Sequence, residues 1–306
     1  MKALENRIAI ALCATAFVGS VFAIDIPAPN ADGQIVLDAQ NGEYVAAADV
    51  VCTQVVFSEN NISVDLSADA GKTISIPSTV TADGLAFSAR YYEAIVSGGI
   101  WDFGGSANLR VGSSHHDHAV TFSCTKVRNV NNVTIGDNRR NCKLTLSDGA
   151  ELAAGSMRIA SGSNSGSCTF EILAGSTATV GGNLIFDDGM SVGSGNNQLR
   201  IEGSKSSLSA PNASVMIGRG SSNDRMSVTG KGSVALQGLT VGGVLDGTVA
   251  KNTVLTVFRG LTACLQSHCT TEKQNSFTSC VTESAKNRCS IFNTDALWHL
   301  QVNFPH

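Results

Sequence analysis

The sequence predicts an all-β protein: a right-handed parallel β-solenoid (β-helix) with three short strands in each coil of about 24 residues. Three observations predict it. A segment of the form apolar-x-apolar-Gly recurs through the middle of the chain, and a second strand-like segment ending in Gly follows several of its copies. The composition, with 31 Gly but only 6% aromatic and 15% charged residues, is typical of many short strands joined by tight turns.

The first segment of the repeat occurs six times. Its copies are "LRVG" at 109, "VTIG" at 133, "MRIA" at 157, "MSVG" at 190, "VMIG" at 215 and "LTVG" at 239. The spacings are 24, 24, 33, 25 and 24 residues. We attribute the one long interval to an insertion that contains "LIFDDG". A unit length this constant favours a solenoid over a β-sandwich or a β-barrel.

The second segment of the repeat lies about eleven residues after the first, and a third apolar pair closes the unit. The second segments are "LTLSDG" at 144, "FEILAG" at 170, "LRIEG" at 199 and "MSVTGKG" at 226. Alternate residues in each strand are apolar, so one side of the strand points inward. One coil cannot bury that side alone, and we therefore expect successive coils to stack in register around a shared core.

The start of the chain is predicted to be a signal peptide, residues 1–23. An apolar stretch, "IAIALCATAFVGSVFA", follows a basic start, and Val21 and Ala23 occupy the −3 and −1 positions of a signal-peptidase site. The stretch is shorter than the roughly 20 residues of a membrane-spanning helix. We expect an exported mature chain that begins near Ile24 and contains no transmembrane segment.

The rest of the chain divides into three parts. Residues 24–108 read as an irregular β lead-in that caps the open end of the solenoid, and residues 109–257 contain the repeats. In residues 258–306 the repeat stops and Gly260 is the only glycine. This Cys-rich tail is either a disulfide-stapled cap or a mis-framed or truncated end, and we favour the second interpretation.

Eight cysteines remain after removal of the signal peptide, and none of them forms a CxxC pair. They are Cys52, Cys124, Cys142, Cys168, Cys264, Cys269, Cys280 and Cys289. Export permits disulfides, but the spacing does not assign the pairing. A structural zinc site has little support, because its usual short Cys spacing is missing.

A cluster of histidines, "SSHHDH", lies between two strands of one coil. Its candidate metal ligands are His115, His116, Asp117 and His118. Other copies hold polar turns such as "DNRRNC" in the same place, and an extended strand would send only two of the four side chains to one side. We therefore interpret the cluster as a polar turn and keep a metal site as the weaker alternative.

A second candidate site lies in the long interval of the repeat. Asp187 and Asp188 lie in the insertion of this interval, and Arg200 lies on a neighbouring strand. β-Helix enzymes that act on polysaccharides carry carboxylates on the coil surface for calcium binding or acid–base work. Charged residues must face outward on any solenoid, so the primary prediction is that no residue is catalytic. No motif predicts a cofactor.

The alternation in "VTIG…LTLSDGAELA" and "VMIG…MSVTGKGSVAL" resembles the β-strand repeats of bacterial autotransporter passengers and sorted surface proteins, over about residues 109–243. The resemblance implies a β-solenoid that is extracellular or on the surface of a Gram-negative-type bacterium. We expect a structural, adhesin-like protein without catalytic activity. Its expected partners are envelope components, a host surface or polysaccharide.

Two further expectations concern function. The alternative to the structural protein is a carbohydrate-active β-helix enzyme, a lyase or hydrolase of an acidic polysaccharide. The net charge of −4, without a cluster of Lys and Arg, argues against nucleic acid as a partner.

Overall fold

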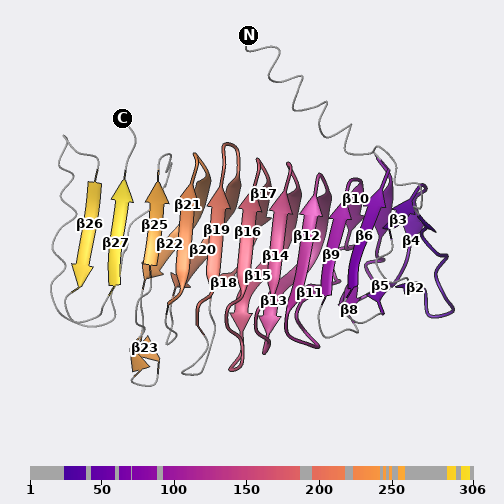
Figure 1. Ribbon diagram of the computed structural model, residues 1–306, viewed down its shortest axis with the longest axis horizontal. Helices are drawn as coiled ribbons and strands as arrows, with labels where there is room; N and C mark the ends of the chain where they lie inside the picture. The colour runs from indigo at the N-terminus through magenta and orange to yellow at the C-terminus, as the bar shows by residue number, and fades with distance from the viewer. Residues whose placement is uncertain are drawn as a thin grey trace, which may run out of the picture.

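The computed structural model confirms the predicted all-β, right-handed parallel β-solenoid (Figure 1). It describes residues 24–38, 43–58, 62–69, 71–87, 92–186, 195–217, 223–241, 244–245, 248–249, 254–258, 288–293 and 298–303. The predicted signal peptide lies outside these ranges. Within them, no helix is long and apolar enough to cross a membrane.

The first face of the solenoid is a sheet of 12 strands in the described part of the chain. In spatial order these are β1 (Ile24–Asp25), β3 (Glu43–Ala46), β6 (Ile62–Ala68), β9 (Tyr92–Ser97), β12 (His118–Ser123), β14 (Lys143–Ser147), β16 (Thr169–Leu173), β19 (Gln198–Glu202), β21 (Arg225–Thr229), β25 (Val254–Phe258), β27 (Trp298–Asn303) and β26 (Arg288–Asn293). Neighbours pair in parallel, except that β26 and β27 are antiparallel.

The second face is formed by strands that follow the first face along the chain. They are β4 (Val50–Val51), β7 (Thr73–Ser75), β10 (Ile100–Asp102), β17 (Thr177–Val180) and the first halves of β13 (Lys126–Asp137), β15 (Glu151–Ser161), β20 (Ser207–Ile217) and β22 (Ser233–Val241). The second halves of these long strands bend onto the third face. Thus β13 pairs with β10 at its start and with β11 (Leu109–Val111) at its end.

The third face closes each coil. It begins with β2 (Gln34–Leu37), β5 (Gln54–Phe57) and β8 (Leu85–Phe87), and an isolated bridge between Asp83 and Asn108 links these strands to β11. Further along the face, β18 (Leu184–Phe186) pairs with the second half of β15. A short antiparallel pair, β23 (Val244–Leu245) and β24 (Thr248–Val249), lies outside the stack of parallel strands.

The predicted repeat is present as in-register stacking. Leu109 pairs with Val133, Val133 with Met157, and Val215 with Leu239. Side chains that share a place in successive coils therefore lie above one another and form continuous buried rows. One such row contains Val120, Leu144, Phe170, Leu199 and Met226. Each of these side chains contributes about 1.5–3 kcal/mol by leaving water.

The fourth copy of the repeat was assigned to the wrong residues. Leu184, rather than Met190, is the residue that pairs with Met157. The segment "LIF" has the same apolar alternation as the other copies, but Asp follows it instead of Gly. The strand therefore lacks the terminal Gly of the repeat signal. The segment "MSVG" at 190 lies outside the described residues.

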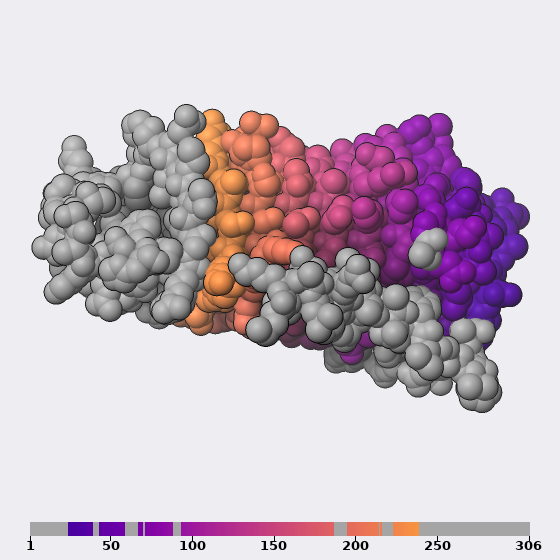
Figure 2. Space-filling view, turned by 90° about the horizontal axis from the view of Figure 1, so that it is seen from above, coloured from indigo at the N-terminus to yellow at the C-terminus, as the bar shows by residue number. Residues whose placement is uncertain are grey.

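The stacked strands also extend beyond residues 109–257. Strands β3 to β10, in the predicted lead-in, pair in parallel with the coils that follow, and Figure 2 shows the described coils as one elongated body. These early strands alternate inward and outward residues like the later ones but lack the Gly signal. In the tail, the described strands β26 and β27 continue the first face beyond β25.

Candidate functional site

The turns that lead from the third face to the first are the most variable part of each coil. We call them the loop row: residues 112–117, 138–142 and 162–168, with the described parts 195–197 and 223–224 of the next two turns. Because the coils are in register, these turns form one row along a single corner of the solenoid. A residue one or two places before each of the strands β12, β14, β16, β19 and β21 has a positive φ, between 53° and 64°. These residues are Asp117 (one place before β12), Asn141, Ser167, Asn196 and Asn223.

The predicted histidine cluster lies in the first turn of the loop row, and its histidines differ in burial. His118 is completely buried, and its ring lies 5.3 Å from that of Phe87. The rings of His115 and His118 are 6.3 Å apart. His116 is exposed, and its Nδ1 accepts a hydrogen bond of 2.8 Å from the backbone N–H of Arg140.

Asp117 explains why the alternation predicted for this segment fails. Its φ of 63° breaks the extended conformation, so His116 and His118, which alternation would place on one side, differ in burial. Its carboxylate accepts a hydrogen bond of 2.7 Å from Asn141 Nδ2 in the next coil. Among the described residues, no group of three or more His, Cys, Asp or Glu side chains is arranged to hold a metal ion.

Two adjacent arginines connect the turns of the loop row. Arg139 Nε donates to the carbonyl of Ser114 at 3.0 Å, and Arg140 Nε donates to the carbonyl of Asn164 at 3.2 Å. Ser114 in turn donates to the carbonyl of Phe87 at 2.7 Å. These bonds join four successive coils and hold three turns of the loop row to one another.

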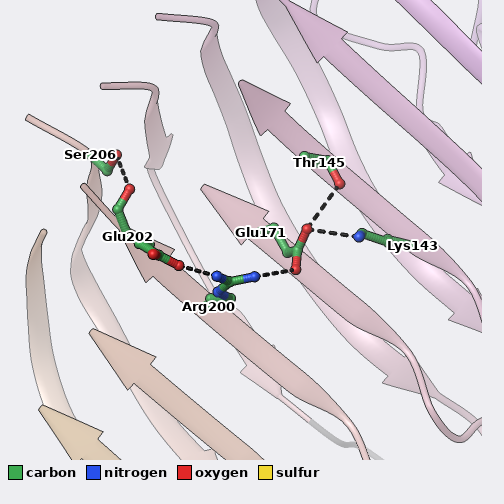
Figure 3. Close-up of polar contacts among 6 residues, drawn as sticks. All are labelled: Lys143, Thr145, Glu171, Arg200, Glu202 and Ser206. Atoms are coloured by element: carbon green, nitrogen blue, oxygen red, sulfur yellow. Dashed lines mark hydrogen bonds and ion pairs between the residues drawn. The ribbon is translucent and has the colours of Figure 1, made fainter. Parts of the chain in front are cut away.

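The second candidate site lies on the first face, where charged side chains from three strands form a line (Figure 3). We call it the charge chain: Lys143, Glu171, Arg200 and Glu202. Glu171 accepts from Lys143 Nζ at 2.8 Å and from Arg200 Nη1 at 3.3 Å. Arg200 also pairs with Glu202. The Glu171 side chain is only 10% exposed. The two cations compensate the carboxylate for the water that it has lost.

Arg200 is therefore held by carboxylates on both sides. Partial burial alone would lower the pKa of its guanidinium, but hydrogen bonds and charge from Glu202 and Glu171 raise that pKa. A cation stabilised in this way does not act as a proton donor. Its proposed companions Asp187 and Asp188 lie outside the described residues, so a catalytic role for the three stays a prediction.

The aligned copies of the repeat contain a signal for the charge chain. Thr145, Glu171 and Arg200 are each the second residue of an aligned strand segment, and they pair in register. Aligning the copies would thus have placed Glu171 beside Arg200. Lys143 was missed because it reaches Glu171 diagonally, from the neighbouring row.

Elsewhere the first face carries small hydroxyl side chains. One row along this face is in register across four strands, and a second row lies two residues earlier in the chain. The first row contains Ser67, Ser97, Ser123 and Ser147, and the second contains Thr121 and Thr145.

Comparisons of the chain with protein-family models, with curated proteins and with solved structures each returned no match.

Proposed function

We propose that this chain is a secreted or cell-surface structural protein, adhesin-like and without catalytic activity, whose loop row contacts a partner. The observation that carries the proposal is the coil-to-coil bonding of that row by Arg139 and Arg140. The rigid stack fixes where each turn lies, while the turn sequences differ from coil to coil. Such an arrangement suits binding, because little conformational entropy is lost when the partner docks.

The charge chain supports this function over the enzymatic alternative. General acid–base catalysis needs a carboxyl group that reaches the substrate with a pKa near the working pH. Glu171 is nearly buried between Lys143 and Arg200, and each of its carboxylate oxygens pairs with one of these cations. The neighbouring rows of Ser and Thr carry no charge, which suits a scaffold.

Surface location is tested with the full chain expressed in a Gram-negative-type bacterium. Intact cells are treated with a protease, and the chain is followed by immunoblotting. We expect degradation without cell lysis, as for a surface-exposed protein. Complete protection in intact cells, followed by degradation after lysis, would overturn the proposed location.

Binding is tested with polygalacturonate as the probe, because the adjacent guanidinium groups of Arg139 and Arg140 favour an acidic partner. We expect the Arg140→Ser variant to bind immobilised polygalacturonate at least threefold more weakly than the original chain. The matched control is Arg225→Ser, which removes an exposed arginine from β21, outside the loop row, and should leave binding unchanged. Equal losses in both variants would contradict a role for the loop row. Release of unsaturated or reducing products in the presence of calcium would favour the enzyme.

A further inference from the structure

Two buried cysteines occupy the same place in consecutive coils. Cys142 directly precedes β14, and Cys168 directly precedes β16. Since Lys143 pairs with Thr169 in parallel, the cysteines immediately before them are in-register neighbours. Both are completely buried.

The two sulfur atoms also lie against the same stretch of backbone. Cys142 Sγ donates to the carbonyl of Arg140 at 3.3 Å, and Cys168 Sγ donates to the carbonyl of Arg139 at 3.4 Å. Arg139 belongs to the turn that leads to Cys142, so the Cys168 side chain points back toward the coil of Cys142.

This geometry suits a covalent link. In-register neighbours on adjacent parallel strands are separated by about 4.8 Å. A disulfide joins Cα atoms that are roughly 4.4–6.8 Å apart. The other described cysteines differ: Cys52 lies beside Ile76 in the next coil, and Cys124 lies beside Asp148.

We infer that Cys142 and Cys168 form a disulfide that joins two consecutive coils at the base of the loop row. The link goes beyond the proposed binding function and does not depend on it. It forms while the coils dock, because the folded structure buries both sulfurs. Once formed, it is protected from reductants by the same burial.

The oxidant is an external disulfide, and the reaction is thiol–disulfide exchange. One of the two cysteines attacks, as its thiolate, one sulfur of the donor and releases one donor thiol. The other cysteine then loses its proton and attacks the protein sulfur of this mixed disulfide, which releases the second donor thiol. Two protein thiols are oxidised, and one donor disulfide is reduced to two thiols.

The test uses the full chain, refolded with a mixture of glutathione and glutathione disulfide. Remaining thiols are blocked with N-ethylmaleimide in denaturant, and the protein is digested with trypsin without reduction. Trypsin cleaves after Arg140, Lys143, Arg158 and Arg200, so the expected product is peptide 141–143 linked to peptide 159–200. Reduction should separate the two. Labelling of both cysteines by N-ethylmaleimide, or linkage of either to another cysteine, would overturn the inference.

A second measurement follows thermal unfolding. We expect the oxidised chain to melt about 5 °C above the reduced chain, because the cross-link restricts the unfolded state. The double variant Cys142→Ala, Cys168→Ala should lose this redox dependence, whereas the buried control Cys52→Ala should keep it. A redox-dependent shift in the double variant as large as in the unsubstituted chain would contradict the assignment. The peptide map is read on the unsubstituted chain, so it decides the question even where a variant fails to fold.

Discussion

At the end of β11, Gly112 has a φ of +81°, a conformation that residues with a β-carbon rarely adopt. A β-carbon added to Gly112 would overlap the sulfur of Cys142, and Gly136 stands in the same relation to Cys168. The Gly of the repeat signal is thus required twice, by backbone conformation and by packing. In the third copy Ala160 takes this place at a φ of 60°, so only the conformational requirement is violated there.

These glycine positions allow a matched comparison. Gly112→Ala should lower the free energy of unfolding by about 3 kcal/mol, the sum of backbone strain and overpacking. Ala160→Gly should change it by less than about 1 kcal/mol, because relief of strain offsets the greater freedom of the unfolded chain. Urea unfolding under reducing conditions measures both. A loss at Gly112 as small as the change at Ala160 would contradict the packing explanation.

Asp102 gives a pH-dependent prediction. Burial alone would raise the pKa of its carboxyl group, but hydrogen bonds from Asn129 Nδ2, the Gly104 N–H and Arg128 outweigh burial and lower that pKa below its ordinary value of 3.8. Because the folded-state pKa is lowered, the ionised group stabilises the fold above the ordinary value. This contribution is lost as the pH falls through the folded-state pKa.

We expect Asp102→Asn to cost about 1 kcal/mol at pH 7, a figure that allows for the exposure of Arg128, and progressively less below pH 3.8. Urea unfolding of both proteins across this range measures the difference. The control is Glu151→Gln, which breaks the exposed pair with Lys126 and should cost less than about 0.5 kcal/mol. A cost at Asp102 that does not change with pH would rule out the charge as its source.

Among individual residues, sequence reasoning predicted the location of the histidine turn but not the burial of His118. An αL residue such as Asp117 reverses the expected direction of the next side chain, and Asp signals this conformation only weakly. The nearer of the two ring neighbours of His118, Phe87, lies in the preceding coil. That contact follows from coil stacking and not from any local pattern.

At the level of strands, the charge chain couples β14, β16 and β19 through Glu171. Replacing Glu171 with Gln leaves Lys143 without its counter-charge and leaves Arg200 paired with Glu202 alone, and we expect a loss of about 1–2 kcal/mol. In a double-mutant cycle with Lys143→Met, the two losses should be non-additive by about 0.5–1 kcal/mol. Chemical unfolding of the four proteins gives this coupling. Strict additivity would show that the ion pair contributes nothing.

Strand prediction succeeded where the inward residues alternate and a Gly follows, as in β11 and the second half of β13. It failed at β18, because Asp replaced the Gly on which the assignment relied. The lead-in, residues 24–108, was predicted to be β structure, but its strands were not predicted to belong to the same stack as the repeats. The coils of the lead-in differ in length and lack a repeated turn signal. No sequence pattern therefore indicates that their strands pair in parallel.

For the whole molecule, distances along the first face test whether the coils are stacked in register. Ser67, Ser97, Ser123 and Thr229 occupy one row of this sheet, at β6, β9, β12 and β21. Counted from Thr229 on β21, Ser123 on β12 is four strands away, Ser97 on β9 is five and Ser67 on β6 is six. With about 4.8 Å between strands, the backbone separations from Thr229 are about 19, 24 and 29 Å.

The decisive measurement is electron–electron double resonance between spin labels placed pairwise on Thr229 and each of these serines. Register-stacked coils predict three distances that increase by about 4.8 Å at each step, even though the steps in sequence are unequal. A cysteine-free background keeps the labelling specific, and the partly exposed row limits disturbance of the core. Distances that fail to rise in this order, or that rise by unequal steps, would contradict the stacked solenoid on which the loop row, the charge chain and the disulfide all depend.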